Sequence, residues 1–146
     1  MAKPQYNYVD VTLIGPEVEE IFAILMQAGI APAAKHDLHA TVIYDERKDM
    51  EAPLAELDPS KVFHANIVSL EVLGDGLVFH LTSRELLEEH MRLKECGYIH
   101  SFDGFMPHMS LTYNFNQYDI LTLRSLFAMW GGRQLTFSRQ GFGTKL

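Results

Sequence analysis

The chain has 146 residues, of which 47% are hydrophobic and 21% are charged, as expected for one globular domain with a sizeable core. Its formal net charge of −7 argues against a protein that follows a long nucleic acid, because such proteins carry a basic stripe and none is visible here. A small anionic ligand is compatible with this charge, since one or two local donors can hold it. We treat residues 1–146 as a single domain.

The sequence offers no targeting or cross-linking signal. No apolar run reaches the length of a membrane span, and the start Met1-Ala-Lys-Pro lacks the apolar core of a signal peptide. Cys96 is the only cysteine, so we expect no internal disulfide and no cysteine-based zinc site. The simplest interpretation is a cytoplasmic protein with no cofactor.

Hydrophobic periodicity predicts strands and helices in alternation. A strand over 6–14 would place Val9, Val11 and Leu13 on one face and Tyr8, Asp10 and Thr12 on the other. The full set of predicted elements is strands at 6–14, 36–45, 61–73, 76–82, 105–113 and 133–139, and helices from Pro16 to Gly29, from a capping box at Thr82 to Cys96, and from a cap at Asp119 to Gly131.

This order contains a rough duplication, in which each half of the chain carries a helix and a similar strand. It predicts an α+β fold of two similar lobes, with a concave sheet between them and helices outside. We expect the tail over 141–145 to be a loose end.

The most specific feature is a pair of matching segments, His39-Ala-Thr41-Val42-Ile43-Tyr44 and His108-Met-Ser110-Leu111-Thr112-Tyr113. Both read His-x-[Thr/Ser]-aliphatic-x-Tyr. Because side chains alternate along a strand, each segment presents its imidazole and its hydroxyl on the same side. We expect His39, Thr41, His108 and Ser110 to be catalytic.

Other residues of these strands are assigned by parity alone. Thr112 shares the face of His108, and Tyr8 lies on the polar face of the first strand, so we expect both to contact substrate. Tyr44 and Tyr113 stand five residues after their histidines, an odd spacing that predicts packing in the core.

Less specific interpretations remain for the histidines. The simplest alternative is that His39 and His108 are half-buried structural histidines. His36 and His39 form H-x-x-H, but in a strand this spacing sends them to opposite faces, so we expect no metal site. His80-Leu81-Thr82 lacks the aliphatic residue and the tyrosine, and we interpret Thr82 as a helix cap rather than a catalytic hydroxyl.

The four motif residues suit cleavage of a phosphodiester. Histidine titrates near neutral pH, so one imidazole can take the proton of an attacking 2′-hydroxyl while the other protonates the departing 5′-oxygen. The hydroxyls can donate to the phosphate oxygens as charge develops. The same groups could open a 2′,3′-cyclic phosphate with water.

The two motifs resemble those of the two-histidine phosphoesterase superfamily, whose members carry H-x-[T/S]-hydrophobic on strands of a bilobal α+β fold and act without metal. Within it, the phrases LHATVIYD and PHMSLTYN are similar to phage anti-CBASS proteins. This resemblance implies a phosphodiesterase that degrades the cyclic di- and trinucleotides used as bacterial alarm signals, as a viral means of evading immunity. It implies a small cyclic oligonucleotide as partner, and neither long nucleic acid nor membrane.

Two alternatives stay open at this point. One is a 2′,3′-cyclic phosphodiesterase acting on RNA ends, and the other is a protein that sequesters cyclic nucleotides without turnover. Intact histidines in both motifs argue against sequestration, because binding alone needs no acid–base pair. The motifs are too alike to tell which histidine is the base.

Overall fold

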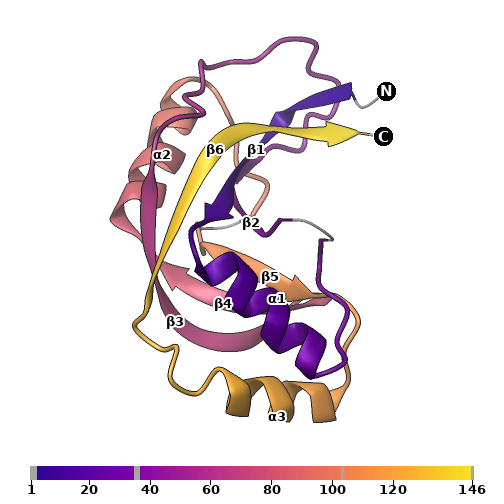
Figure 1. The fold of residues 1–146 in the computed structure, drawn as a ribbon. Coiled ribbons are helices and arrows are strands. Elements are labelled where there is room, and N and C mark those ends of the chain that lie inside the picture. The colour runs from indigo at the N-terminus through magenta and orange to yellow at the C-terminus, as the bar shows by residue number, and fades with distance from the viewer. Residues whose placement is uncertain (1–2, 35–36, 103, 146) are drawn as a thin grey trace.

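The computed structural model describes residues 3–34, 37–102 and 104–145. Within these ranges the chain forms a mixed α/β fold with an antiparallel sheet of six strands and three helices (Figure 1). In chain order the elements are β1 (Lys3–Ile14), α1 (Glu17–Gln27), β2 (His39–Tyr44), β3 (Phe63–Leu73), β4 (Gly76–Thr82), α2 (Arg84–Glu95), β5 (His108–Thr112), α3 (Gln117–Leu126) and β6 (Gln134–Lys145).

The sheet closes on itself in the order β1-β2-β5-β4-β3-β6. β1 and β6 pair along most of their length, and Figure 1 shows the two chain ends side by side for this reason. The closure is completed by β3 and β6, where Phe63 pairs with Phe137 and Asn66 with Gln134. As a result β2 and β5, the two motif strands, are neighbours, with β1 on the other side of β2 and β4 on the other side of β5.

One face of the strands supplies the core. Val9, Val11 and Leu13 of β1 are buried, as the alternation predicts, while Tyr8, Asp10 and Thr12 stay partly exposed. The helices cover this apolar face with their own buried side chains, which are Ile21 and Leu25 of α1, Leu86 and Leu93 of α2, and Leu123 of α3. Burying one such side chain stabilises the fold by roughly 1.5–3 kcal/mol. The opposite face is left free for polar groups.

Two helix starts differ from the sequence prediction by one to three residues. Ser83, not Thr82, caps α2, and its hydroxyl accepts a hydrogen bond from the Leu86 N–H at 3.1 Å. Asn116 caps α3, and Asp119 stands at the third helical position, where its carboxylate accepts from the Asn116 N–H at 3.0 Å. This reciprocal pair is a capping box.

The C-terminal segment is not a loose end. β6 continues to Lys145, and its residues Gly141 and Gly143 pair with Asp10 and Gln5 of β1. The backbone groups of 141–145 therefore serve as ladder partners. The prediction of a loose end was wrong because the pairing of this segment with β1 joins the two ends of the chain, and a local pattern does not show such a contact.

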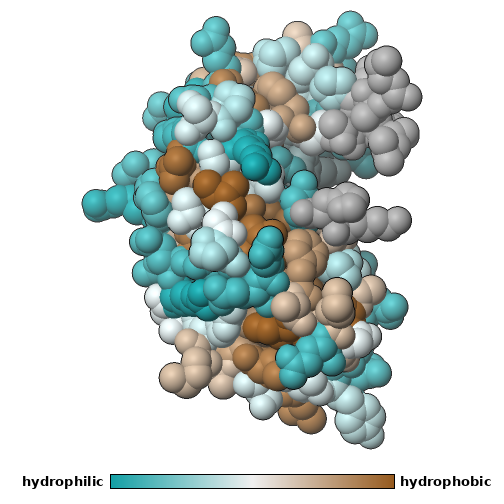
Figure 2. All heavy atoms as spheres, viewed as in Figure 1, coloured by the Kyte–Doolittle hydropathy of each residue, from teal (hydrophilic) through white to brown (hydrophobic). Residues whose placement is uncertain are grey.

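Apolar side chains are exposed at several places on the described part of the surface. In the view of Figure 2 the hydrophobic areas are small and separated by hydrophilic residues. The most exposed examples are Met129, at 91%, and Met26, at 79%. None of the helices in the described part of the chain has both the length and the apolar character needed to cross a membrane.

Candidate active site

The two motif strands lie directly beside one another. β2 and β5 are antiparallel, with Ala40 opposite Met109, and both of these side chains are fully buried. In this antiparallel register, the residues next to Ala40 lie opposite the residues next to Met109, so His39 is opposite Ser110 and Thr41 is opposite His108. Because side chains alternate, these four residues all lie on the face opposite the core, and each is partly exposed. Directly opposed residues have Cβ atoms about 4.5–5.5 Å apart, so the two imidazoles and two hydroxyls form one group.

His108 has a defined tautomer. Its Nδ1 lies 2.9 Å from the carbonyl oxygen of Met106, which can only accept, so Nδ1 carries the proton. In the neutral ring Nε2 is then left with a lone pair. The backbone ahead of the strand thus fixes the ring and makes Nε2 available for proton transfer.

Tyr8 extends the site onto β1. Its hydroxyl shares a hydrogen bond of 2.9 Å with the Thr41 hydroxyl, and burial raises the pKa of Tyr8, so the phenol is protonated at neutral pH. The sequence expectation was that Tyr8 contacts substrate. The structure shows a contact to a motif hydroxyl, which orients Thr41.

Asp10 is a nearby residue that sequence reasoning did not single out. It pairs with Thr41 across β1 and β2, and Thr12 pairs with His39. Burial raises the pKa of the Asp10 carboxyl, and the proximity of His39 acts in the opposite direction. The strand pattern had placed Asp10 on the polar face, but its neighbour on β2 depends on the register between strands, which the sequence does not display.

Tyr44 lies on the site face, contrary to prediction. β2 contains a bulge: Ile43 pairs with Val9, but Thr41 pairs with Asp10, so Val42 is the additional residue. Val42 and Ile43 are both buried, and the alternation therefore resumes with Tyr44 on the side of Thr41. The Tyr44 ring meets the Tyr8 ring edge to face at 5.7 Å.

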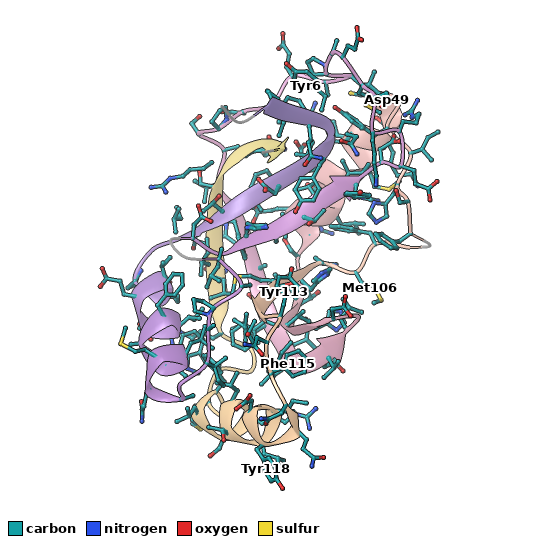
Figure 3. All side chains as sticks on the ribbon, turned by 90° about the vertical axis from the view of Figure 1, so that its right-hand side faces the viewer. Tyr6, Asp49, Met106, Tyr113, Phe115 and Tyr118 are labelled. Carbon is teal, nitrogen blue, oxygen red and sulfur yellow. The ribbon has the colours of Figure 1, made fainter. Side chains whose placement is uncertain are left out.

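Tyr113 is also outside the core. It follows the end of β5 and is 61% exposed, with its ring close to Gly76. Figure 3 looks at the molecule from the right-hand side of Figure 1 and shows Tyr113 near the middle of this side, with Met106 to its right. The prediction of core packing was wrong because Tyr113 begins a turn, where strand parity no longer applies.

Thr112 does not join the other motif residues at the surface. It is fully buried, and its hydroxyl accepts from the Asn114 N–H at 3.1 Å. The ladder to β4 is irregular here, since Thr112 pairs with Leu77 but Ser110 pairs with Val78. Thr112 therefore closes the turn after β5, and its position does not support contact with substrate.

His80 of β4 stands beside the group instead. It pairs directly with His108, and its Nδ1 lies 3.3 Å from Glu71 Oε2. Local sequence patterns did not favour His80, because its own segment lacks the rest of the motif. Its place next to His108 depends on a strand pairing between distant parts of the chain.

Two further histidines hold the segment between α2 and β5. The buried His90 donates from Nδ1 to the Val42 carbonyl at 2.7 Å, and its ring stacks on Phe105 at 4.1 Å. His100 accepts at Nδ1 from the Tyr44 N–H at 3.3 Å. Burial lowers the pKa of both rings. They hold the backbone of β2 at Val42 and at Tyr44, as expected for structural histidines.

A metal site was not expected from the sequence, and its one candidate pair included His36, which lies outside the described residues. Within the described ranges, no three His, Cys, Asp or Glu side chains gather closely enough to hold a metal ion.

The family model of the anti-CBASS protein Acb1 matches residues 5–129, which extend from β1 to just beyond α3. The match covers most of the 146 residues, and the chain therefore belongs to the Acb1 family of anti-CBASS proteins. Membership of this family implies an interaction with cyclic oligonucleotides. No protein in the curated set matches the chain.

Proposed function

We propose that this protein is a metal-independent phosphodiesterase that cleaves 3′–5′ bonds in cyclic di- and trinucleotides. One observation carries the proposal: the two His-x-[Thr/Ser] motifs lie on adjacent antiparallel strands, with each histidine opposite the hydroxyl of the other motif. The two imidazoles are diagonal neighbours on one face, a relation that separates residues by about 7–8 Å, so they can address a single phosphate from two sides.

The reaction requires two proton transfers and no external reactant. One imidazole accepts the proton of a ribose 2′-hydroxyl, whose oxygen attacks the adjacent phosphorus. The bond from phosphorus to the 5′-oxygen breaks, and the second imidazole, in its protonated form, donates a proton to that oxygen. The product is a linear oligonucleotide with a 2′,3′-cyclic phosphate at one end and a 5′-hydroxyl at the other.

The hydroxyls of Thr41 and Ser110 donate to the non-bridging phosphate oxygens as negative charge grows on them. Thr41 is held for this task by Tyr8, whose hydroxyl lies 2.9 Å away. We assign Tyr8 to the substrate-facing group through this contact and through its partly exposed ring. Loss of either motif hydroxyl should cost roughly 10–10³-fold in rate, by analogy with deletion of single donors.

The strand order supports a relationship to the two-histidine phosphoesterases. β2 and β5 are neighbours, β1 and β4 flank them, and β6 and β3 complete the closed sheet. Each half of this arrangement contains a strand, a helix and a motif strand, namely β1-α1-β2 and β4-α2-β5. We propose that these halves are the two lobes of the superfamily fold and that the polar face at their junction binds substrate.

In this proposal the protein acts in the cytoplasm of an infected bacterium. Cleavage of the cyclic messenger there would prevent activation of CBASS and allow the virus to evade this defence. The family match supports this biological role.

The substrate is tested by incubating the protein in EDTA with 3′,3′-cyclic dinucleotides, cyclic trinucleotides and an RNA ending in a 2′,3′-cyclic phosphate. The proposal predicts rapid conversion of the cyclic compounds to linear products. Activity on the RNA end alone would replace the proposal with RNA-end processing. Tight binding of the cyclic compounds with no product in any reaction would indicate sequestration.

A further inference from the structure

A third histidine belongs to the same face. His80 is the direct partner of His108 in the β4–β5 ladder, and its side chain is 37% exposed. Adjacent strands are about 4.8 Å apart, so His80 lies one strand beyond His108 and about 10 Å from the β2 strand that carries His39. His80 is thus on the outer flank of the pair and not between its members.

Glu71 of β3 is the acidic neighbour of the His80 ring. The Nδ1 of His80 lies 3.3 Å from Glu71 Oε2, a distance at which the carboxylate forms an ion pair with the protonated ring. When the ring is protonated, Nε2 is its second donor. Because Nδ1 faces Glu71, Nε2 is the atom that remains for a ligand.

The polar face contains few groups that can carry positive charge. Among the described strand residues that surround His108, namely Asp10, Thr12, His39, Thr41, Ser69, Glu71, His80 and Ser110, only the histidines can be cationic. Cyclic dinucleotides carry two phosphates and cyclic trinucleotides three. The scissile phosphate engages His39 and His108, and a second phosphate then needs another donor.

The surface next to His80 has room for the rest of the ligand. His80 lines an open recess of about 370 Å³, together with Val68, Thr82, Leu87 and Phe105. This volume is at the lower end of the roughly 300–1,000 Å³ typical of small-molecule sites. The recess adjoins the motif strands through Pro107, the residue before His108. A ligand held at His108 can therefore extend in this direction.

We infer that His80 binds a phosphate of the cyclic oligonucleotide other than the one being cleaved. This inference rests on the proposed function for the identity of the ligand. His80 takes no part in proton transfer to the reacting atoms, and its contribution is to the affinity of the enzyme for a ligand with more than one phosphate.

The test compares how tightly a 3′,3′-cyclic dinucleotide binds to proteins with and without a change at His80. All of them carry His39→Ala, which suppresses turnover. Addition of His80→Gln should weaken binding about tenfold, the effect expected for one hydrogen bond to a charged group. His80→Arg should restore most of the affinity, because it returns a cationic donor. The matched control is His64→Gln, since His64 also pairs with a glutamate, Glu85, at 3.0 Å, but lies on β3 near the start of α2.

Kinetics of the otherwise unchanged enzyme give an independent readout. His80→Gln should raise KM about tenfold and leave kcat within about twofold. A lower kcat at unchanged KM would place His80 at the scissile phosphate and overturn the inference. Equal binding by His80→Gln and its parent would overturn it as well. If the protein binds the dinucleotide but never cleaves it, the proposed function fails, while the binding comparison still decides the role of His80.

Discussion

Replacing Asp45 with asparagine tests how the end of β2 is held. Asp45 follows the first motif segment and is 1% exposed. Its Oδ1 accepts from the backbone N–H and Nε of Arg47, and its Oδ2 accepts from Arg47 Nη2 at 2.7 Å and from the Ile99 N–H at 2.7 Å. The carboxylate therefore joins β2 to the segment between α2 and β5. An asparagine keeps the shape of the side chain but has no charge and only one acceptor oxygen.

The pKa of Asp45 gives the expected size of the effect. The hydrogen bonds from Arg47, joined by those from backbone N–H groups, lower this pKa from 3.8 to about 2. A difference of this size corresponds to about 2 kcal/mol of stability. Arg47 is half exposed, so solvent screening reduces the benefit, and we expect about 1–2 kcal/mol. Because the folded pKa is the lower one, this contribution is complete above about pH 5 and is lost as the pH falls towards 2.

The assay is urea unfolding of wild type and Asp45→Asn at pH 7 and at pH 3. The difference in unfolding free energy should be about 1–2 kcal/mol at pH 7 and clearly smaller at pH 3. Asp75→Asn is the control, since Asp75 is exposed in the β3–β4 turn and its carboxylate makes no hydrogen bond or ion pair to the described residues. An Asp45→Asn effect that is the same at both pH values would refute the electrostatic reasoning.

Two further variants test the surroundings of the site. Tyr8→Phe removes the hydroxyl that holds Thr41 while keeping the ring. It should lower kcat/KM by about 3–10-fold, the effect of one hydrogen bond, with little loss of stability. A kcat/KM equal to that of the wild type would show that Thr41 needs no such support. Gly143→Ala should also lower kcat/KM, because a Cβ at this position would lie 2.6 Å from Tyr8 Cδ1 and displace the ring that holds Thr41. In a double-mutant cycle measured by kcat/KM, Gly143→Ala should cost little once Tyr8 is alanine, and an equal cost in both backgrounds would contradict the contact.

Local patterns in the sequence predicted the elements and the two faces of the sheet well. Alternation along β1 separated Val9 and Val11 from Tyr8 and Asp10, and alternation within each motif placed the histidine on the same face as its hydroxyl. These predictions succeeded because side-chain parity within a strand and the helix period depend on nearby residues only.

The parts that could not be predicted depend on contacts between distant residues. The bulge at Val42 returns Tyr44 to the site face, and no local signal marks it. The end of β5 at Thr112 likewise turns Tyr113 outward. His80 reaches the site only through the pairing of β4 with β5. Strand register and strand order are decided by the packing of the whole sheet, which a linear pattern does not contain.

The central claim is that the imidazoles of His39 and His108 act together on one phosphate. The most direct measurement is the rate at which His39→Ala, His108→Ala and the double variant linearise a cyclic dinucleotide in EDTA, with His64→Gln as a histidine control. Each single variant should lose about 10²–10⁴-fold, and the double variant should lose little more, because both groups serve the same transition state. Near wild-type cleavage by either single variant would contradict the account.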